Sequence, residues 1–350
     1  MILILRWILL PISLIYQLIV WIRNRMFDLN ILKSKSFDIP TIVIGNLAIG
    51  GAGKSPMTEY LIHLLKDKYT VATLSRGYGR KTKGFKYVNI DSTAIEVGDE
   101  PMQFKNKFPE ITVAVSEDRC KGIDYLQKNN EVVLLDDAFQ HRKLKAGFYM
   151  LLFDFNSLFE PHLLLPTGNF RDNFSSTKRA DIVIITKCPS IISIQEKNKI
   201  EHIIRRYTTV PLFYSSIIYK DLIPVNNSFP ISFIKNYDIV LFCGIANPSP
   251  LVKHLKSINN NVHLLTFSDH HNYTINDFEN IKNFYNKLES NSKIILTTEK
   301  DSQRINKEYF IDYPLYYIPI SININNYNDI PIDSYIETYI NQTINTNKYE

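Results

Sequence analysis

Residues 41–57, TIVIGNLAIGGAGKSPM, decide the fold. A β-branched apolar run at residues 41–44 predicts a buried strand, and the glycine-rich loop that follows ends in Gly53, Lys54 and Ser55. Pro56 is tolerated in the first turn of a helix, and the next residues carry an apolar stripe at helical spacing. A strand, a loop and a helix in this order are the layout of a phosphate-binding P-loop.

The chemistry of this loop depends on its residue types. Small residues allow backbone N–H groups to surround phosphate oxygens, Lys54 can reach the terminal phosphates, and the Ser55 hydroxyl can ligate Mg²⁺. Ala48 replaces the first glycine of the usual motif and is small enough to keep this interpretation. The alternative is a tight turn that binds no ligand.

Composition narrows the class of protein. The 350 residues are 45% hydrophobic, which is typical of one large or two ordinary packed domains and not of a disordered chain. The net charge of +5 is too small and too dispersed to indicate a nucleic-acid partner. Cys120, Cys188 and Cys243 have neither zinc-ligand spacing nor the pattern of a disulfide framework, so we expect a reduced, cytoplasmic compartment.

The first 22 residues, MILILRWILLPISLIYQLIVWI, are almost entirely apolar. As a helix they would be about 33 Å long, roughly the thickness of the hydrocarbon core of a bilayer. Arg6, Ser13, Gln17 and Asn24 would share one narrow face of that helix. This polar stripe favours a monotopic helix on a membrane surface over a single span or a buried core helix, and the nearby basic residues favour an anionic cytoplasmic leaflet.

Short buried strands alternate with helices beyond the glycine-rich loop. The ranges that have the pattern of strands are 70–74, 112–115, 132–135, 150–153 and 181–186. This alternation indicates a P-loop NTPase-like α/β fold, in which a mostly parallel sheet has helices on both faces.

A second, smaller α/β domain is expected from about residue 238. Its expected strands are 263–267 and 294–297, and its expected helices are 251–258 and one from about residue 276. Residues 207–237 suggest a linker region, and the tail after residue 322 has no interpretable pattern. The expected divisions are a membrane-associating helix at 1–27, a P-loop kinase domain at 28–210, the smaller domain at 211–325 and a tail at 326–350.

Two acidic residues end one of the expected strands. The run VVLLDD places Asp136 and Asp137 at its carboxyl end, as in a Walker B element whose carboxylate holds Mg²⁺ or its waters. A strand followed by an Asp-rich turn is the alternative. Gln140 and His141 follow at the mouth of the same site, where they either contact phosphate or substrate or have a capping or packing role.

A base for proton transfer can be sought in two other segments. An alcohol that attacks a γ-phosphate needs a group to accept its proton, and Asp99, in the EVGDEP turn with Glu100, could supply a carboxylate. A histidine of the SDHH segment, His270 or His271, could orient that base. Solvated loops are the alternative in both places.

Basic side chains complete the set of candidates. A glycine-rich loop at residues 75–86, SRGYGRKTKGFK, suits phosphate groups on an acidic substrate, although a solvated basic loop is the alternative. Arg119 and Arg171 are further candidates to neutralise a moving phosphoryl group.

The order of these motifs carries more information than any one of them. The chain resembles the tetraacyldisaccharide 4'-kinase family, P-loop kinases of lipid A biosynthesis that act on a disaccharide lipid at the inner membrane. The motifs that carry the resemblance are VIGNLAIGGAGKSP, LSRGYGR, GDEP, LLDDAFQHRKL, LLPTGNFRD, FCGIANP, FSDHHNYT and LTTEKD. The resemblance extends from the apolar start to about Asp301, and its departures are small, such as Ala138 where glycine is frequent.

The resemblance implies ATP and Mg²⁺ as cofactors and assigns roles to matching positions. Its catalytic residues map to Asp99, with His270 as the partner of this base, and to Lys54. Its nucleotide-binding positions map to Gly50, Gly51, Ala52, Gly53, Lys54, Ser55, Arg119, Gln140, His141 and Arg171. Its metal-binding positions map to Ser55, Glu100, Asp136 and Asp137.

We therefore expect a kinase that transfers the γ-phosphate of ATP to the 4'-hydroxyl of an acylated glucosamine disaccharide 1-phosphate, giving lipid IVA. Its expected partners are ATP, this lipid and a membrane surface, without nucleic acid, at the cytoplasmic face of the inner membrane. A membrane-associated P-loop ATPase or GTPase switch that acts on a protein partner is the alternative. A guanine-specific switch would need an [NT]KxD run, which neither TKCP at 186–189 nor TEKD at 298–301 supplies.

Overall fold

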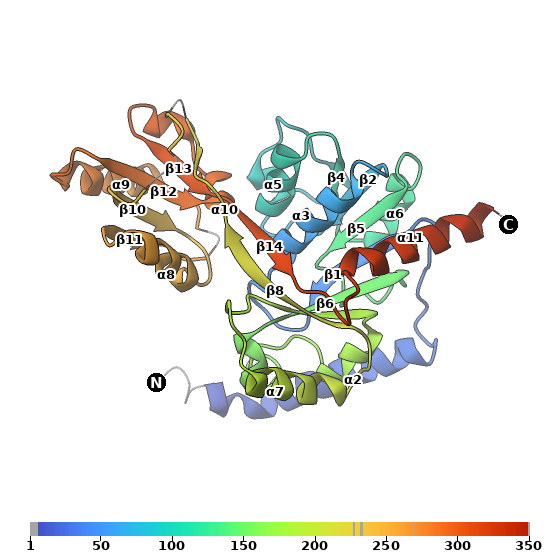
Figure 1. Ribbon diagram of the computed structural model, residues 1–350. Helices are drawn as coiled ribbons and strands as arrows, with labels where there is room; N and C mark the ends of the chain where they lie inside the picture. The colour runs from blue at the N-terminus through green and yellow to red at the C-terminus, as the bar shows by residue number, and fades with distance from the viewer. Residues whose placement is uncertain (1–5, 227, 232–233, 270, 349–350) are drawn as a thin grey trace. The chain divides into compact units, whose positions relative to one another are not determined.

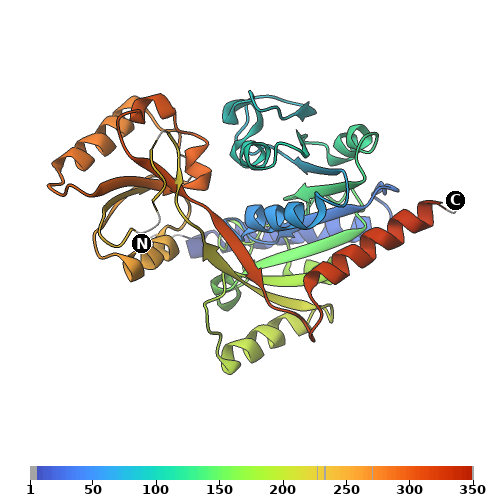
Figure 2. The same cartoon turned by 45° about the horizontal axis from the view of Figure 1, so that its top comes forward.

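The computed structural model describes residues 6–226, 228–231, 234–269 and 271–348, which form two compact units. Unit 1 contains Met1–Ile217 and Ile322–Glu350, and unit 2 contains Ile218–Ser321. The chain passes between the units inside strands β8 (Leu212–Tyr219) and β14 (Ile320–Ile324). These strands are neighbours in one sheet, and Figure 2 shows them in yellow and orange-red.

Unit 1 is built on a sheet of nine strands among the described residues, in the order β14-β8-β7-β6-β1-β5-β2-β4-β3 (Figure 1). All pairs from β4 to β8 along this row are parallel. The edge strands run antiparallel to their neighbours: β3 pairs with β4, and β14 lies beside β8, where Lys220 N–H donates to the carbonyl of Pro319 and Asn325 N–H to that of Tyr214. The bounds are β1 Thr41–Asn46, β2 Val71–Ser75, β3 Lys86–Tyr87, β4 Thr112–Val115, β5 Val132–Asp136, β6 Phe148–Asp154 and β7 Ile182–Thr186. The expected parallel sheet is confirmed.

Helices cover both faces of this sheet, and the central strands β1 and β5 are therefore buried at every residue. Residues of α6, α7 and α2 pack on one face, and residues of α3, α5 and α11 pack on the other (Figure 1). The bounds are α2 Leu10–Asp28, α3 Lys54–Leu65, α4 Ala94–Val97, α5 Asp99–Lys107, α6 Arg119–Leu126, α7 Ile194–Arg205 and α11 Ile332–Lys348, with 3₁₀ helices η1 Asn156–Phe159 and η2 Phe174–Arg179.

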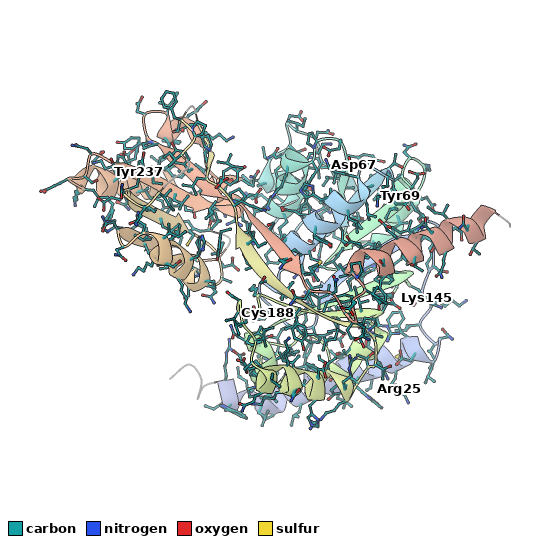
Figure 3. The ribbon with its side chains drawn as sticks, viewed as in Figure 1. Arg25, Asp67, Tyr69, Lys145, Cys188 and Tyr237 are labelled. Carbon is teal, nitrogen blue, oxygen red and sulfur yellow. The ribbon has the colours of Figure 1, made fainter. Side chains whose placement is uncertain are left out.

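Parts of two segments without an expected role in the fold belong to unit 1. The interpretation of residues 207–237 as a linker is wrong at its start, because β8 is a strand of the nine-stranded sheet. The tail after residue 322 forms β14 and α11, and Ile332, Ile336 and Ile340 of α11 are buried in the core. Tyr69, labelled beside α11 in Figure 3, donates a hydrogen bond to Asn341 at 3.2 Å.

Helix α2 turns its polar side toward the protein. The Ser13 hydroxyl donates to Thr167 at 2.8 Å, and Asn24 Nδ2 donates to Asp172 Oδ1 at 2.8 Å. Both side chains are buried, whereas Gln17 of the expected stripe is exposed. The apolar side is exposed, which excludes a buried core helix. Its exposed residues include Ile12, Leu14, Ile15, Leu18, Ile19, Trp21 and Ile22, and Trp7 and Ile8 just before the helix are exposed as well. No helix among the described residues has the length and hydropathy to cross a bilayer.

Unit 2 has its own sheet, with the order β11-β10-β12-β13-β9 among the described residues. Its core lies on both sides of that sheet, with α8 packed on one face and α9 and η3 on the other. Its elements are β9 Ile223–Pro224, β10 Asp238–Cys243, α8 Ser249–Ile258, β11 Val262–Thr266, α9 Ile275–Lys287, β12 Lys293–Thr298, α10 Glu299–Ser302, η3 Lys307–Phe310 and β13 Leu315–Ile318. The expected second, smaller α/β unit is confirmed.

Truncating the α11 core contact tests how far the carboxyl-terminal helix stabilises unit 1. Ile336 has no exposed surface, so Ile336→Ala leaves a cavity beside α3 and should lower the free energy of unfolding by about 2–5 kcal/mol. Urea unfolding followed by circular dichroism measures this change. Thr338→Ala, at an exposed position of the same helix, is the control. Equal stability of the two variants would show that α11 is dispensable for the core.

Candidate active site around the glycine-rich loop

The loop between β1 and α3 is shaped by its glycines. Gly50 has φ +102° and Gly53 has φ +78°, a region of backbone conformation that residues with a Cβ rarely adopt. Gly53 is the N-cap of α3, and no side chain caps this end of the helix. The first N–H groups of α3 therefore have no side-chain acceptor from the N-cap residue, and such groups favour an anion such as phosphate.

Neighbouring segments hold the loop in place. The Thr186 hydroxyl at the end of β7 donates to the carbonyl of Ala52 at 2.9 Å. The Ile49 N–H donates to the carbonyl of Asn169 at 2.7 Å. The loop is thus fixed from two sides, which favours a preorganised anion site.

Asn46 connects the main charged groups of the site. Its Oδ1 accepts hydrogen bonds from Lys54 Nζ at 3.3 Å and from Arg171 Nη2 at 2.8 Å. Arg171 also binds both carboxylate oxygens of Asp137, and Lys54 Nζ lies 3.8 Å from Asp137 Oδ1. Two cations are consequently directed to one place beside the loop by a buried amide and a carboxylate.

The adjacent carboxylates Asp136 and Asp137 differ in environment. Asp136 is 1% exposed and, among the described residues, its Oδ1 has no hydrogen-bond partner. Burial, and next the nearby Glu100, raise the pKa of Asp136 to about 8. Burial acts in the same direction on Asp137, but the hydrogen bonds of Arg171 and the charge of Lys54 lower the pKa of that carboxyl below its usual value.

Ser55 and Glu100 meet across the site. The Ser55 hydroxyl donates to Glu100 Oε1 at 3.0 Å. Glu100 also lies close enough to Asp136 for its charge to raise the pKa of the Asp136 carboxyl, so two carboxylates share this part of the site. Ser55, Glu100 and Asp136 thus supply oxygen ligands of the kind that a hard divalent cation prefers.

Asp99 precedes Glu100 and is the first residue of α5, where the sequence had indicated only a turn. Gly98 before it has φ +96°, and a Cβ at this position would lie 3.1 Å from the carbonyl oxygen of Tyr78 and 3.2 Å from Gly77. The glycine therefore allows the basic loop at residues 75–86 to pack directly against the start of α5. Asp99 lies beside that loop, and the next residue, Glu100, is the one that contacts Ser55.

Arg119, Gln140 and His141 line the surroundings of the acidic pair. Arg119 Nη2 donates to the carbonyl of Asp137 at 3.4 Å, and its burial lowers the pKa of the guanidinium to about 10. Gln140 Nε2 donates to the carbonyl of Asn46 at 2.7 Å. The His141 ring lies with Asp118 and Cys120, their ligand-type atoms within 4.8 Å of one another, and burial lowers its pKa to about 4.

The basic loop divides into paired and exposed cations. Arg80 Nη2 lies 2.5 Å from Glu117 Oε1, and Lys86 Nζ lies 3.1 Å from Glu96 Oε1. The side chains of Arg76, Lys81 and Lys83 are exposed. The paired cations hold the loop, and the exposed ones are available to an anionic ligand.

The SDHH segment belongs to unit 2, and His270 lies outside the described residues. The neighbouring His271 contacts Asp277 Oδ2 at 3.0 Å through its Nε2. In the same unit, buried Asp301 of the TTEKD segment accepts a hydrogen bond from the Gly244 N–H at 3.0 Å, which fixes the start of the GIANP loop.

Two functional positions were missed in the sequence. Asn46 contacts Lys54, Arg171 and Gln140, and Thr186 supports the loop at Ala52. Asn46 and Thr186 are polar residues at the carboxyl ends of buried strands, and this position was the available signal because such ends face the ligand in parallel sheets.

Comparisons with known proteins agree with this arrangement. The model of the family described as tetraacyldisaccharide-1-P 4'-kinase matches residues 5–337. The tetraacyldisaccharide 4'-kinase of Bacteroides thetaiotaomicron is 41% identical, over 98% of this chain and 95% of the relative, and that of Flavobacterium johnsoniae is 43% identical, over 95% and 98%.

A solved structure has the same fold. LpxK from Aquifex aeolicus, crystallised in complex with ATP, matches with a TM-score of 0.75 and 29% sequence identity. The match covers 97% of this chain and 99% of that one. By sequence over nearly its whole length, this chain belongs to the tetraacyldisaccharide-1-P 4'-kinase family.

Proposed function

We propose that this protein transfers the γ-phosphate of ATP to the 4'-hydroxyl of a tetraacyldisaccharide 1-phosphate, which forms lipid IVA in lipid A biosynthesis. Family membership supports this activity. The structural observation that carries it is the convergence of Lys54, the Ser55–Glu100 pair and Asp137 beside a loop suited to phosphate. A switch that merely hydrolyses nucleotide would not need Asp99 beside a basic loop that suits an anionic acceptor.

The residues present fit Mg²⁺. The Oδ1 atom of Asp136 is buried without a hydrogen-bond partner among the described residues, and the raised pKa of Asp136 marks a carboxylate whose charge lacks compensation. We assign Mg²⁺ to Ser55, Glu100 and Asp136. The ion would supply positive charge to the phosphate oxygens during transfer. Asp137, which pairs with Arg171 and Lys54, is assigned to orienting these cations.

The protein's own groups account for the other steps. Backbone N–H groups of residues 50–53 and Lys54 hold the β- and γ-phosphates, and Arg119 and Arg171 stabilise the charge on the transferred group. Asp99 accepts the proton of the attacking hydroxyl. The role of His270, which lies outside the described residues, as the partner of this base is what the family resemblance implies. We assign the exposed cations Arg76 and Lys81, in the loop packed against Gly98, to anionic groups of the substrates.

The outward side of α2 supports a place at the membrane. Its Ser13 and Asn24 side chains bond to the protein, while an apolar strip that includes Trp21 is left exposed. This distribution is that of a helix lying in the interface of a bilayer. We therefore propose a peripheral or monotopic position on the cytoplasmic face of the inner membrane, where the acyl chains of the substrate remain in the lipid.

Removing the acceptor that Lys54 and Arg171 share tests the phosphate site. Asn46→Ala should weaken ATP binding about tenfold or more, because two charged donors lose one preorganised partner. Titration with a fluorescent ATP analogue gives the dissociation constant. Asn89→Ala, at an exposed position outside the site, is the control. Unchanged affinity in Asn46→Ala would remove Asn46 from the phosphate site.

The transfer itself is tested with γ-labelled ATP, Mg²⁺ and the disaccharide lipid in detergent micelles. Label should appear in the lipid. In Asp99→Asn, kcat should fall by about 10²–10⁴ with ATP affinity nearly intact, because the base is lost and the phosphate site remains.

The matched control for this experiment is Asp91→Asn, at an exposed position before α4. Label released only as free phosphate by the wild-type protein would support the hydrolytic switch instead. A fully active Asp99→Asn variant would exclude Asp99 as the base.

Polar substitutions on the exposed side of α2 test the membrane position. Leu18 and Ile22 are 55% and 44% exposed, so Leu18→Asn with Ile22→Asn should leave the folded body unchanged and weaken membrane binding tenfold or more. Sedimentation of cell membranes measures the bound fraction. Ile90→Asn with Ile95→Asn, at exposed apolar positions elsewhere, is the control. Equal retention of both double variants on membranes would contradict the proposed orientation.

A further inference from the structure

A cationic pocket lies between α2 and η2, on the part of unit 1 that carries the exposed apolar strip. It has a volume of about 320 Å³, and we call it the α2 pocket. The residues that define its charge and shape are Trp21, Arg25, Asp28, Arg142, Lys178 and Arg179. None of these residues belongs to the proposed kinase site.

Two guanidinium groups of the pocket are held in fixed positions. Arg142 Nη2 lies 2.9 Å from Asp28 Oδ1, and its Nη1 donates to the carbonyl of Asn24 at 2.9 Å. Arg179 Nη2 lies 3.0 Å from Asp172 Oδ2, and its guanidinium stacks over Phe139. Both cations are therefore preorganised, so a ligand would bind them without first ordering two long side chains.

Two further cations of the pocket are not paired with a carboxylate among the described residues. Arg25, labelled on α2 in Figure 3, and Lys178 of η2 are exposed, and within the described part of the chain no carboxylate pairs with either of them. The lining has four basic residues, Arg25, Arg142, Lys178 and Arg179, and one acidic residue, Asp28, so its net charge is +3. Counting Asp172 behind Arg179 reduces this to +2. The pocket is therefore suited to an anion.

Uncharged donors add to this preference. Asn173 lines the pocket, is only 8% exposed, and has an Nδ2 without a hydrogen-bond partner among the described residues. The Ser175 side chain is exposed at the same place. A phosphate has three or more acceptor oxygens, and guanidinium, ammonium and amide groups are its usual partners.

The surroundings indicate what carries the anion. Trp21 is 52% exposed in the pocket wall, and Leu18 and Ile22 on the same helix, with Leu29 directly after it, are also exposed. A free anion would use only the cationic side of this surface. A lipid with an anionic head group would use both sides, with the head group among the cations and the acyl chains along the apolar strip.

We propose that the α2 pocket binds the phosphate of an anionic glycerophospholipid. This inference rests on the proposed membrane position of α2. The bound lipid adds a specific contact to the general attraction between basic residues and an anionic leaflet. It also fixes how the protein is rotated about the axis of α2 on the membrane surface.

The test measures binding to vesicles of phosphatidylcholine alone and to vesicles with equal amounts of phosphatidylcholine and phosphatidylglycerol. The wild type should prefer the anionic vesicles. Arg25→Gln with Lys178→Gln should reduce this preference at least tenfold, because two basic residues leave the interface. Lys121→Gln with Lys128→Gln, an equal charge change at exposed positions outside the pocket, should reduce it much less. Equal losses in both variants would overturn the proposal in favour of diffuse attraction.

A second measurement distinguishes the sources of the phosphate. The chain has two tryptophans, so in Trp7→Phe the fluorescence of Trp21 reports on the pocket. Phosphatidylglycerol added to detergent micelles should give a saturable change that phosphatidylcholine does not give. An equal response to inorganic phosphate would identify a free-anion site and contradict the lipid assignment.

Kinase assays in detergent separate this inference from the proposed function. The pocket variant should keep kcat and the KM for the disaccharide lipid. A rise in that KM equal to the loss of phosphatidylglycerol binding would assign the pocket to the substrate's phosphate and overturn the proposal. A wild-type protein with the lipid preference and without kinase activity would contradict the proposed function alone, and a protein that binds no vesicles would contradict both the membrane position and this inference.

Discussion

The structure of the site depends on placing two successive carboxylates at the buried end of β5. Asp136 and Asp137 cannot both be buried as anions without compensation, since a buried charge needs a partner or neutralises. The left-handed backbone of Asp137, with φ +52°, marks a sharp turn at the end of the strand, and the two carboxylates meet different partners. Asp137 takes the cations Lys54 and Arg171, while Asp136 keeps a buried oxygen without a hydrogen bond among the described residues. This asymmetry leaves the protein with one carboxylate that a metal ion would compensate.

Local patterns predicted the parts of the molecule that local chemistry determines. The β-branched run of β1, the glycine-rich loop and the stripe of α3 were predicted because each depends on residues close in sequence, and the same holds for VVLLDD. Arg6, Ser13, Gln17 and Asn24 were predicted to share one face of the amino-terminal helix. Ser13 and Asn24 are buried against the protein, whereas Gln17 is exposed, and which side faces the protein depends on Thr167 and Asp172, about 150 residues away in sequence. The roles of Asp99 and His270 came from the family resemblance and stay predictions.

The missed features depend on contacts between distant segments. α11 has isoleucines at positions 332, 336 and 340, a helical spacing that the surrounding repeats of Asn, Ile and Tyr obscured. Its burial arises because the face of the sheet that carries α3 and α5 leaves space for another helix, and a sequence window does not contain that information. Asn46 was part of a quoted motif, yet its importance comes from Arg171, 125 residues later, which shares its side-chain oxygen with Lys54. The sequence could have indicated polar residues at strand ends as candidate site residues, but not which side chains they contact.

The segment 167–172 joins helix α2 to the glycine-rich loop, so the helix is more than a detachable anchor. On one side, Asn169 Oδ1 accepts a hydrogen bond from Arg6, and Asp172 accepts one from Asn24. On the other side, the Asn169 carbonyl accepts the N–H of Ile49, and the Arg171 N–H donates to Leu47. Displacing α2 would leave the buried carboxylate of Asp172 with one donor fewer, and the backbone that holds residues 47 and 49 would lose its support. Because Arg171 also binds Asp137, the same displacement would reach the cations of the phosphate site, and the position of α2 is therefore mechanically linked to the geometry of that site.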